Sequence, residues 1–208
     1  MSQLTWTEHD TEFPISLDVH SLHLTDDQFY LLCRDNSDLR LELSAEGELI
    51  IMPPAYSETG WKEARIVRRL DAWAEEDGTG RCYGPSAGFT LPNGAKRAPD
   101  SSWISHKRWN SLKAEDREKM ARICPDFVVE LRSATDRLQQ MKNKMAEYIQ
   151  NGARLGWLLD RIEERVYILR TGIQVECLEN PTELSGEDVL PGFRFNFKEI
   201  LGNYRDAP

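Results

Sequence analysis

Acidic residues and lysines in the second half of the chain are of the types that metal-dependent phosphodiesterases use. Asp100 follows a proline, Asp126 and Glu130 lie in one apolar segment, and Lys142 and Lys144 lie in the segment after it. Carboxylate oxygens bind hard cations such as Mg²⁺, and a lysine can neutralise a phosphate. The same residues can also be ordinary charges of an α/β domain, so each has to be placed on an element.

The segment PDFVVELR predicts a strand whose side chains alternate between two faces. One face carries Phe127, Val129 and Leu131 and must be core. The other face carries Glu130 and Arg132, and a buried charge needs either a partner or a metal ion. A salt bridge from Glu130 to Arg132, or to another nearby arginine, is the simpler alternative to a metal site.

Spacing along this strand limits which carboxylates can act together. Asp126 and Glu130 lie about 13 Å apart in a strand, whereas oxygen ligands lie about 2.0–2.6 Å from a cation. The second ligand beside Glu130 must therefore come from another strand. Asp100 is the best candidate because it begins an extended segment after Pro99. Asp126 is then a strand-entry residue, or a group that supports the site without touching the cation.

The next segment, residues 136–151, predicts a helix with one apolar face. Lys142 and Lys144 flank that face on opposite sides, and either could extend along the core and place its ammonium at the edge of the sheet. Two solvated surface lysines are the ordinary alternative, and periodicity does not choose between these readings. Asp136 is expected to cap the helix, with two nearby hydroxyl residues as competitors.

Another helix is predicted over residues 58–77, where apolar residues recur at steps of three. Glu63 lies among the basic residues of this helix. It could reach the site from the opposite side, but a surface ion pair is the expected arrangement.

The order of the elements predicts an α/β fold with a mixed sheet. Strand 126–132, helix 136–151 and strand 154–160 can form a βαβ unit with both strands in one sheet. A capping box at Thr25 predicts a short helix, and the segments LRLELS and ELIIMP predict a hairpin. Further expectations are a charged helical excursion over 107–122, and a closing strand with three alternating phenylalanines packed in the core over 193–197.

Composition narrows the class of protein. The 208 residues suggest a single domain, with residues 1–47 as an N-terminal elaboration of a core over 48–201. A net charge of −9 argues against a general nucleic-acid coat but leaves room for a nuclease with an acidic metal site. No apolar run reaches about 18 residues, so no membrane span is expected. Scattered cysteines and the lack of a signal-peptide pattern predict a reduced, cytoplasmic protein.

Four segments together resemble the Uma2 (DUF820) family, a branch of the PD-(D/E)xK restriction-endonuclease-like nucleases. They are RAPDSSWIS, PDFVVELRSATD, KMAEYIQNGARLGWLLD and LSGEDVLPGFRF, within a resemblance that runs from about Glu48 to Leu201. The resemblance implies a restriction-endonuclease-like α/β core, with a mixed central sheet flanked by helices. An N-terminal hairpin extension would precede this core.

The resemblance also implies site residues. Asp100 and Glu130 would be catalytic acids that hold Mg²⁺ or Mn²⁺, with a backbone carbonyl near Leu131 as a further ligand. The third motif position is Arg132 instead of lysine, and arginine stays protonated, so it can neutralise charge but cannot act as a base. Lys144 matches the position to which the lysine has moved in many of these proteins. The accessory candidates are Glu63, Asp126, Arg132 and Lys142.

The implied activity is that of a Mg²⁺-dependent DNA endonuclease. The main alternative is a non-catalytic binding or regulatory module of the same fold, whereas a small-molecule hydrolase has no supporting motif. Convergence of Asp100, Glu130 and Lys144 in an open pocket would favour the enzyme. Glu130 locked to Arg132 in a closed core would favour the module. A homodimer would supply the two sites that cutting both strands of a duplex requires, although no sequence feature shows one.

Overall fold

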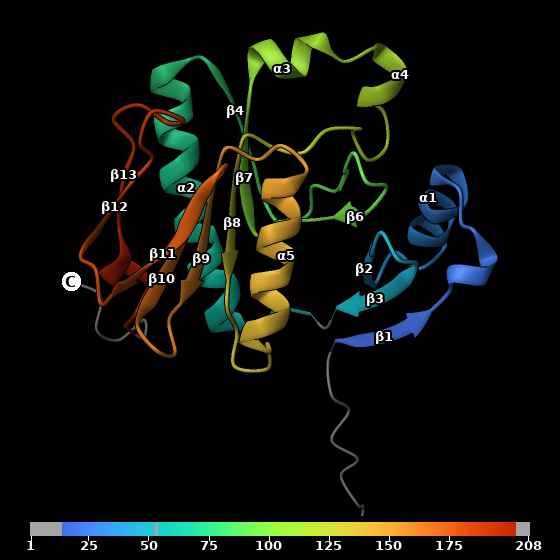
Figure 1. Ribbon diagram of the computed structural model, residues 1–208, viewed down its shortest axis with the longest axis horizontal. Coiled ribbons are helices and arrows are strands. Elements are labelled where there is room, and N and C mark those ends of the chain that lie inside the picture. The colour runs from blue at the N-terminus through green and yellow to red at the C-terminus, as the bar shows by residue number, and fades with distance from the viewer. Residues whose placement is uncertain (1–13, 53, 203–208) are drawn as a thin grey trace, which may run out of the picture.

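A computed structural model gives the fold and describes residues 14–52 and 54–202. Its centre is a six-stranded sheet of order β11-β10-β9-β8-β7-β4, here called the central sheet (Figure 1). Two long helices accompany it. These elements are β4 (Gly80–Tyr83), β7 (Ser101–Ser105), β8 (Phe127–Leu131), β9 (Leu155–Asp160), β10 (Arg165–Arg170), β11 (Ile173–Glu179), α2 (Ser57–Asp77) and α5 (Leu138–Gln150).

The predicted βαβ unit is confirmed. Strands β8 and β9 pair in parallel, with α5 as the connection, while the other neighbours in the central sheet pair antiparallel. Gly152 follows α5 with a φ of +107°, a conformation that glycine adopts without strain. The expected cap is wrong: α5 starts two residues later, and the Asp136 carboxylate instead accepts a hydrogen bond from the Ser133 backbone N–H at 2.7 Å.

Helices α2 and α5 cover opposite faces of the central sheet. Phe127, Val129 and Leu131 pack with Leu70 of α2, as alternation predicts, while Val128 packs with the cluster under α5. The three phenylalanines over 193–197 are core, as expected. The strand there is shorter than expected: β13 (Arg194–Asn196) pairs with β12 (Glu183–Ser185) in a two-stranded sheet, and the 3-10 helix η2 (Phe197–Ile200) follows.

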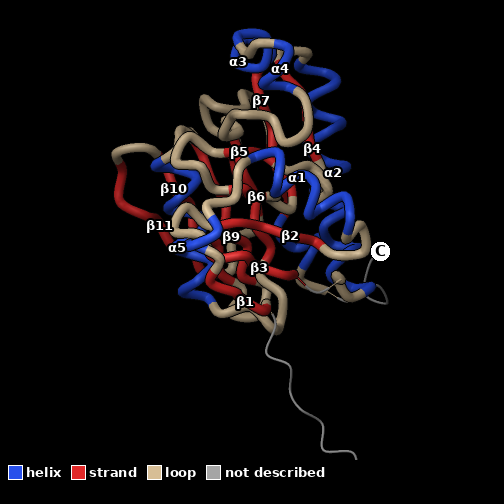
Figure 2. Tube along the Cα trace, turned by 90° about the vertical axis from the view of Figure 1, so that its right-hand side faces the viewer, coloured by secondary structure: helices blue, strands red, loops and turns tan. Residues whose placement is uncertain are grey.

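A second sheet, here called the N-terminal sheet, has the order β1-β3-β2-β6-β5 (Figure 2). The predicted hairpin is β2–β3, and α1 has the predicted capping box. Residue 47, the expected boundary of the N-terminal elaboration, lies in the turn of this hairpin. The elements are β1 (Ile15–Asp18), η1 (His20–Leu22), α1 (Asp26–Asp35), β2 (Arg40–Leu43), β3 (Glu48–Met52), β5 (Phe89–Thr90) and β6 (Lys96–Arg97).

The charged excursion between β7 and β8 forms two short helices, α3 (His106–Ser111) and α4 (Ala114–Arg117). They lie at one end of the central sheet, away from the β2–β3 hairpin (Figure 1). None of the helices in the described ranges is long and apolar enough to cross a membrane.

Candidate active site

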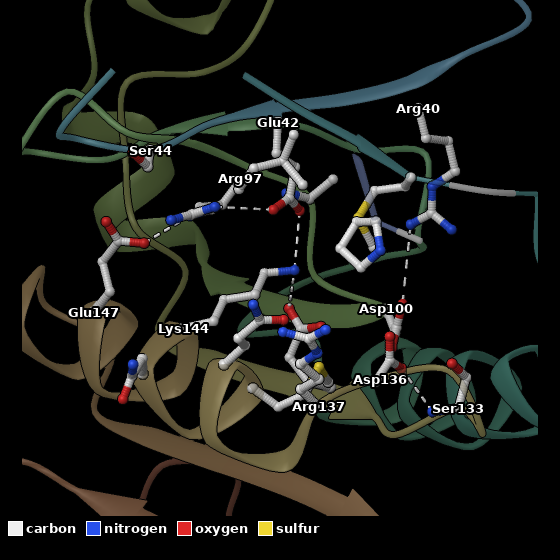
Figure 3. A pocket seen from close by; sticks show the side chains of 18 of the residues that line it. Arg40, Glu42, Ser44, Arg97, Asp100, Ser133, Asp136, Arg137, Lys144 and Glu147 are labelled. Carbon is white, nitrogen blue, oxygen red and sulfur yellow. Dashed lines mark hydrogen bonds and ion pairs between the residues drawn. The ribbon is translucent and has the colours of Figure 1, made fainter. Parts of the chain in front are cut away.

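A cavity of about 650 Å³ lies between the N-terminal sheet, α5 and the edge of the central sheet where β8 ends. Its wall includes the three principal candidates of the sequence, Asp100, Glu130 and Lys144. Figure 3 labels Asp100 and Lys144 in this wall. The three come from different elements: Asp100 directly precedes β7, Glu130 lies in β8, and Lys144 lies in α5.

The two acids are brought together by strand pairing. In the antiparallel pair β7–β8, Ser101 lies opposite Val129, so Asp100 lies beside the next residue of β8, which is Glu130. The Leu131 backbone N–H donates a hydrogen bond to Asp100 Oδ2 at 2.8 Å. Both carboxylates are buried. The two acids therefore come from neighbouring strands and lie side by side, as the spacing along β8 predicted.

Lys144, and not Lys142, extends from α5 into this cavity. Its Nζ lies 2.8 Å from Glu130 Oε1 and 2.9 Å from Glu42 Oε1. The Tyr148 hydroxyl, one turn along the helix, donates to the same Glu130 Oε1 at 3.0 Å. Lys142 lies on the other side of the apolar face, with its Nζ 4.1 Å from the centre of the Tyr167 ring.

Burial dominates the electrostatics of the two acids. It raises the pKa of Asp100 to about 6, with a further contribution from the negative charge of Glu63. It also raises the pKa of Glu130 to about 8, where the ammonium of Lys144 opposes burial and the charge of Asp100 adds to it. Burial works to lower the pKa of Lys144, but the carboxylates of Glu130, Glu42 and Asp100 raise it overall. Lys144 is therefore a fixed positive charge rather than a base at neutral pH.

The donor set of the cavity suits a hard divalent cation. Each carboxylate has one oxygen engaged by protein donors and one that is not: Glu130 Oε2 has no hydrogen-bond partner in the described part of the chain, and Asp100 Oδ1 has only the Arg40 guanidinium at 3.9 Å. No three of the described His, Cys, Asp and Glu residues cluster closely enough to bind a metal by themselves. Mg²⁺ commonly uses one or two carboxylates and completes its shell with water, so Asp100 and Glu130 fit it.

Glu63 also faces the cavity, so the expected surface ion pair is wrong. Its side chain is buried on α2 and lines the cavity wall. Burial raises the pKa of Glu63, the charges of Glu130 and Asp136 raise it further, and Arg40 opposes them. Glu63 is therefore a third carboxyl group near Asp100 and Glu130, and it binds a proton more tightly than a solvated glutamate does.

Two accessory candidates lie outside the cavity and hold the fold together. Asp126 accepts a hydrogen bond from the Ser105 N–H at 2.9 Å and pairs with Arg108 at 3.2 Å, which makes it a strand-entry residue. Arg132 pairs with the fully buried Asp160 at 2.8 Å. The Glu130–Arg132 salt bridge considered as the simpler alternative is therefore wrong.

Several residues of the cavity have no counterpart among the candidates drawn from the sequence. Glu42 of β2 contacts Lys144, and Arg97 of β6 bridges Glu42 and Glu147 (Figure 3). Tyr148 reads in the sequence as one more apolar residue of α5. The one feature of the sequence that could have indicated these residues is Glu42, an acid between two leucines of a short strand. No local pattern, however, shows which surface that strand covers.

Known proteins share this fold and sequence pattern. A family model described as "Uma2: Putative restriction endonuclease" matches residues 26–198. A similar solved structure is a "putative nuclease belonging to DUF820 from Anabaena variabilis ATCC 29413", which is 18% identical with a TM-score of 0.72. The alignment covers 86% of this chain and 97% of that one, and at this identity the likeness establishes the fold alone. No curated protein matches the sequence.

Proposed function

The chain belongs to the Uma2 family, as its motifs predict, and we propose that it is a divalent-cation-dependent endonuclease that hydrolyses phosphodiester bonds in DNA. The observation that carries this proposal is the convergence of two buried carboxylates and a lysine on one cavity. The ion-pair partner of Glu130 is Lys144, at 2.8 Å, while Arg132 pairs with Asp160, which favours the enzyme over a non-catalytic module.

Asp100 and Glu130 are the residues that would hold Mg²⁺ or Mn²⁺. When bound, the cation would lower the pKa of a coordinated water and stabilise the negative charge that develops on the phosphate. Lys144 and Tyr148 fix Glu130 Oε1, which leaves Oε2 for the cation. The ammonium of Lys144 then supplies a fixed positive charge for the scissile phosphate, where charge develops in the transition state.

The cavity also carries positive charge that a polyanion requires. Arg40 and Arg137 lie in its wall together with Lys144 (Figure 3). The same wall also carries eight acidic residues, so in a chain of net charge −9 a polyanion would depend on a bound divalent cation as well as on these side chains. Contacts to phosphates depend on such local charge and weaken as salt concentration rises. A homodimer, which would offer two such cavities to a duplex, is part of this proposal.

A cleavage assay tests the proposal. Supercoiled plasmid and labelled oligonucleotides, single- and double-stranded, are incubated with the protein in Mg²⁺, Mn²⁺ or EDTA. We expect cleavage that needs the cation and is lost in Glu130→Ala, but kept in Glu179→Ala, which removes an exposed glutamate of β11. Cation-dependent cleavage that persists at the wild-type rate in Glu130→Ala would contradict the assignment. A wild-type protein that binds DNA without cutting any substrate would favour the binding module.

A further inference from the structure

Lys144 is shared between two carboxylates that come from different sheets. Glu130 belongs to the central sheet, while Glu42 belongs to β2 of the N-terminal sheet, and their Oε1 atoms lie 2.8 and 2.9 Å from the lysine Nζ. The ammonium of Lys144 therefore lies between two carboxylates, one from each sheet. Figure 3 shows Lys144 directed at Glu42.

Glu42 is itself held rigidly. Its Oε1 accepts a second hydrogen bond, from the Ala98 N–H at 3.0 Å, and its Oε2 pairs with Arg97 at 3.1 Å. Arg97 is held in turn by Glu147 of α5, with Nε 2.6 Å from Glu147 Oε2. All of these groups are buried or nearly so, and buried side chains fixed by several partners have little freedom to reorient.

The contacts of Glu42 also argue against a role for it as a metal ligand. Both of its oxygens are engaged by protein donors, whereas Asp100 and Glu130 each keep one oxygen that accepts no hydrogen bond from the described residues. A carboxylate whose oxygens face an ammonium, a guanidinium and a backbone N–H is a poor ligand for a metal ion, because these positive groups repel a cation. Glu42 therefore stands behind the lysine rather than among the ligands.

Glu42 gives Lys144 a second carboxylate partner, which would matter when Glu130 binds a cation. With a divalent cation bound at Glu130, this carboxylate would hold the lysine less strongly, and the ammonium would face a like charge, which interacts strongly in a partly dry cavity. With Glu42 in place, the ammonium keeps a partner on the far side from the cation. Without it, the lysine would be pushed away from the place where the phosphate has to bind.

We infer that Glu42 is a positioning residue for the reaction, which holds Lys144 in the cavity from the N-terminal sheet and is held there by Arg97 and Glu147. This inference rests on the proposed function for its consequence, the placement of the lysine at the phosphate. It also makes the N-terminal sheet a working part of the site instead of an appendage to the nuclease core.

The test is a double-mutant cycle between Glu42→Gln and Lys144→Met. Glutamine keeps the size of the side chain and, at the Oε1 position, a neutral acceptor for the Ala98 N–H and for Lys144. It removes the negative charge that holds the ammonium and places an amide donor against Arg97, which keeps Glu147 as its partner. We expect Glu42→Gln to lower kcat by about tenfold or more with KM nearly unchanged, as misplacement of a catalytic group does. In the Lys144→Met background the same substitution should cost almost nothing, because its effect passes through the lysine. Glu187→Gln, which removes a glutamate paired with Arg170 outside the cavity, is the matched control and should keep wild-type kcat.

A second readout needs neither metal nor substrate. In metal-free protein, the ammonium of a pinned and shielded lysine gives a ¹H–¹⁵N NMR signal, because its protons exchange slowly with water. We expect one such signal that is absent in Lys144→Met, and we expect Glu42→Gln to lose it. An unchanged or raised kcat in Glu42→Gln, or an equal loss in the Lys144→Met background, would overturn the inference. A wild-type protein that cleaves nothing would contradict the proposed function instead, and persistence of the ammonium signal in Glu42→Gln would then overturn the role of Glu42 by itself.

Discussion

The metal-free protein should become more stable when Asp100 is replaced by asparagine. Burial, helped by the charge of Glu63, raises the pKa of Asp100 to about 6 from an ordinary value of 3.8. Each pKa unit corresponds to about 1.4 kcal/mol, so ionised Asp100 costs the folded protein on the order of 3 kcal/mol at neutral pH. Asparagine has nearly the same shape and brings no charge into the cavity, so Asp100→Asn removes this cost.

The sign of the effect follows from proton linkage. Asp100 binds its proton more tightly in the folded chain than in the unfolded chain, so it favours folding below about pH 4 and this advantage is lost as the pH rises through about 6. The Asp100→Asn variant has no carboxyl group to ionise at this position, so it does not lose this stability as the pH rises. The free energy of unfolding of the variant should therefore match that of the wild type near pH 4 and exceed it increasingly up to about pH 6–7.

Urea denaturation in EDTA, followed by tryptophan fluorescence at several pH values, measures this difference. The matched control is Asp126→Asn, since Asp126 is also buried but is paired with Arg108 and the Ser105 N–H. That variant should lose stability. Added Mg²⁺ should stabilise the wild type, because a ligand that binds only the folded state shifts the equilibrium, and should not stabilise Asp100→Asn. A metal-free Asp100→Asn protein that is less stable than the wild type at pH 7 would refute the reasoning.

Three further variants test other contacts of the site. Lys144→Met should lower kcat by about a hundredfold while Lys142→Met stays within about threefold of the wild type, since only the first removes a charge from the cavity; equal effects on cleavage would contradict the placement. Tyr148→Phe removes an O–H that favours the ionised glutamate, so half-maximal Mn²⁺ binding, measured by calorimetry across pH, should move to higher pH by up to about one unit; a shift to lower pH would contradict this. Arg132→Met leaves the buried Asp160 unpaired and should cost about 3 kcal/mol in urea denaturation without lowering kcat; a large loss of kcat in the folded variant would show that the arginine acts in catalysis.

Local pattern was sufficient for much of the fold. Alternation in residues 126–132 placed Phe127, Val129 and Leu131 in the core, and the βαβ order predicted the parallel pair that the structure contains. Strand spacing separated Asp126 from Glu130 and directed attention to Asp100, because distances along a strand are fixed by backbone geometry. These inferences depend only on neighbours in the sequence or on the regular dimensions of an element.

The rest of the site depends on contacts between distant elements, which no local pattern records. Lys142 and Lys144 flank the same apolar face, and the positions of β8 and β2 decide that Lys144 meets a carboxylate from each of these strands. Glu63 reads as a surface residue among basic neighbours, but α2 turns it towards the cavity. Glu42 lies 102 residues from Lys144 in the chain, so its role becomes visible only when the N-terminal sheet is in place.

The central claim is that Asp100 and Glu130 together hold the divalent cation on which cleavage depends. Anomalous diffraction from crystals of the protein soaked in Mn²⁺ tests it most directly, with Glu130→Gln crystals treated in the same way. We predict one strong anomalous peak within about 2.0–2.6 Å of an oxygen from each carboxylate, and no peak at this place in Glu130→Gln. A peak elsewhere in the molecule, or none near these residues at saturating Mn²⁺, would contradict the account.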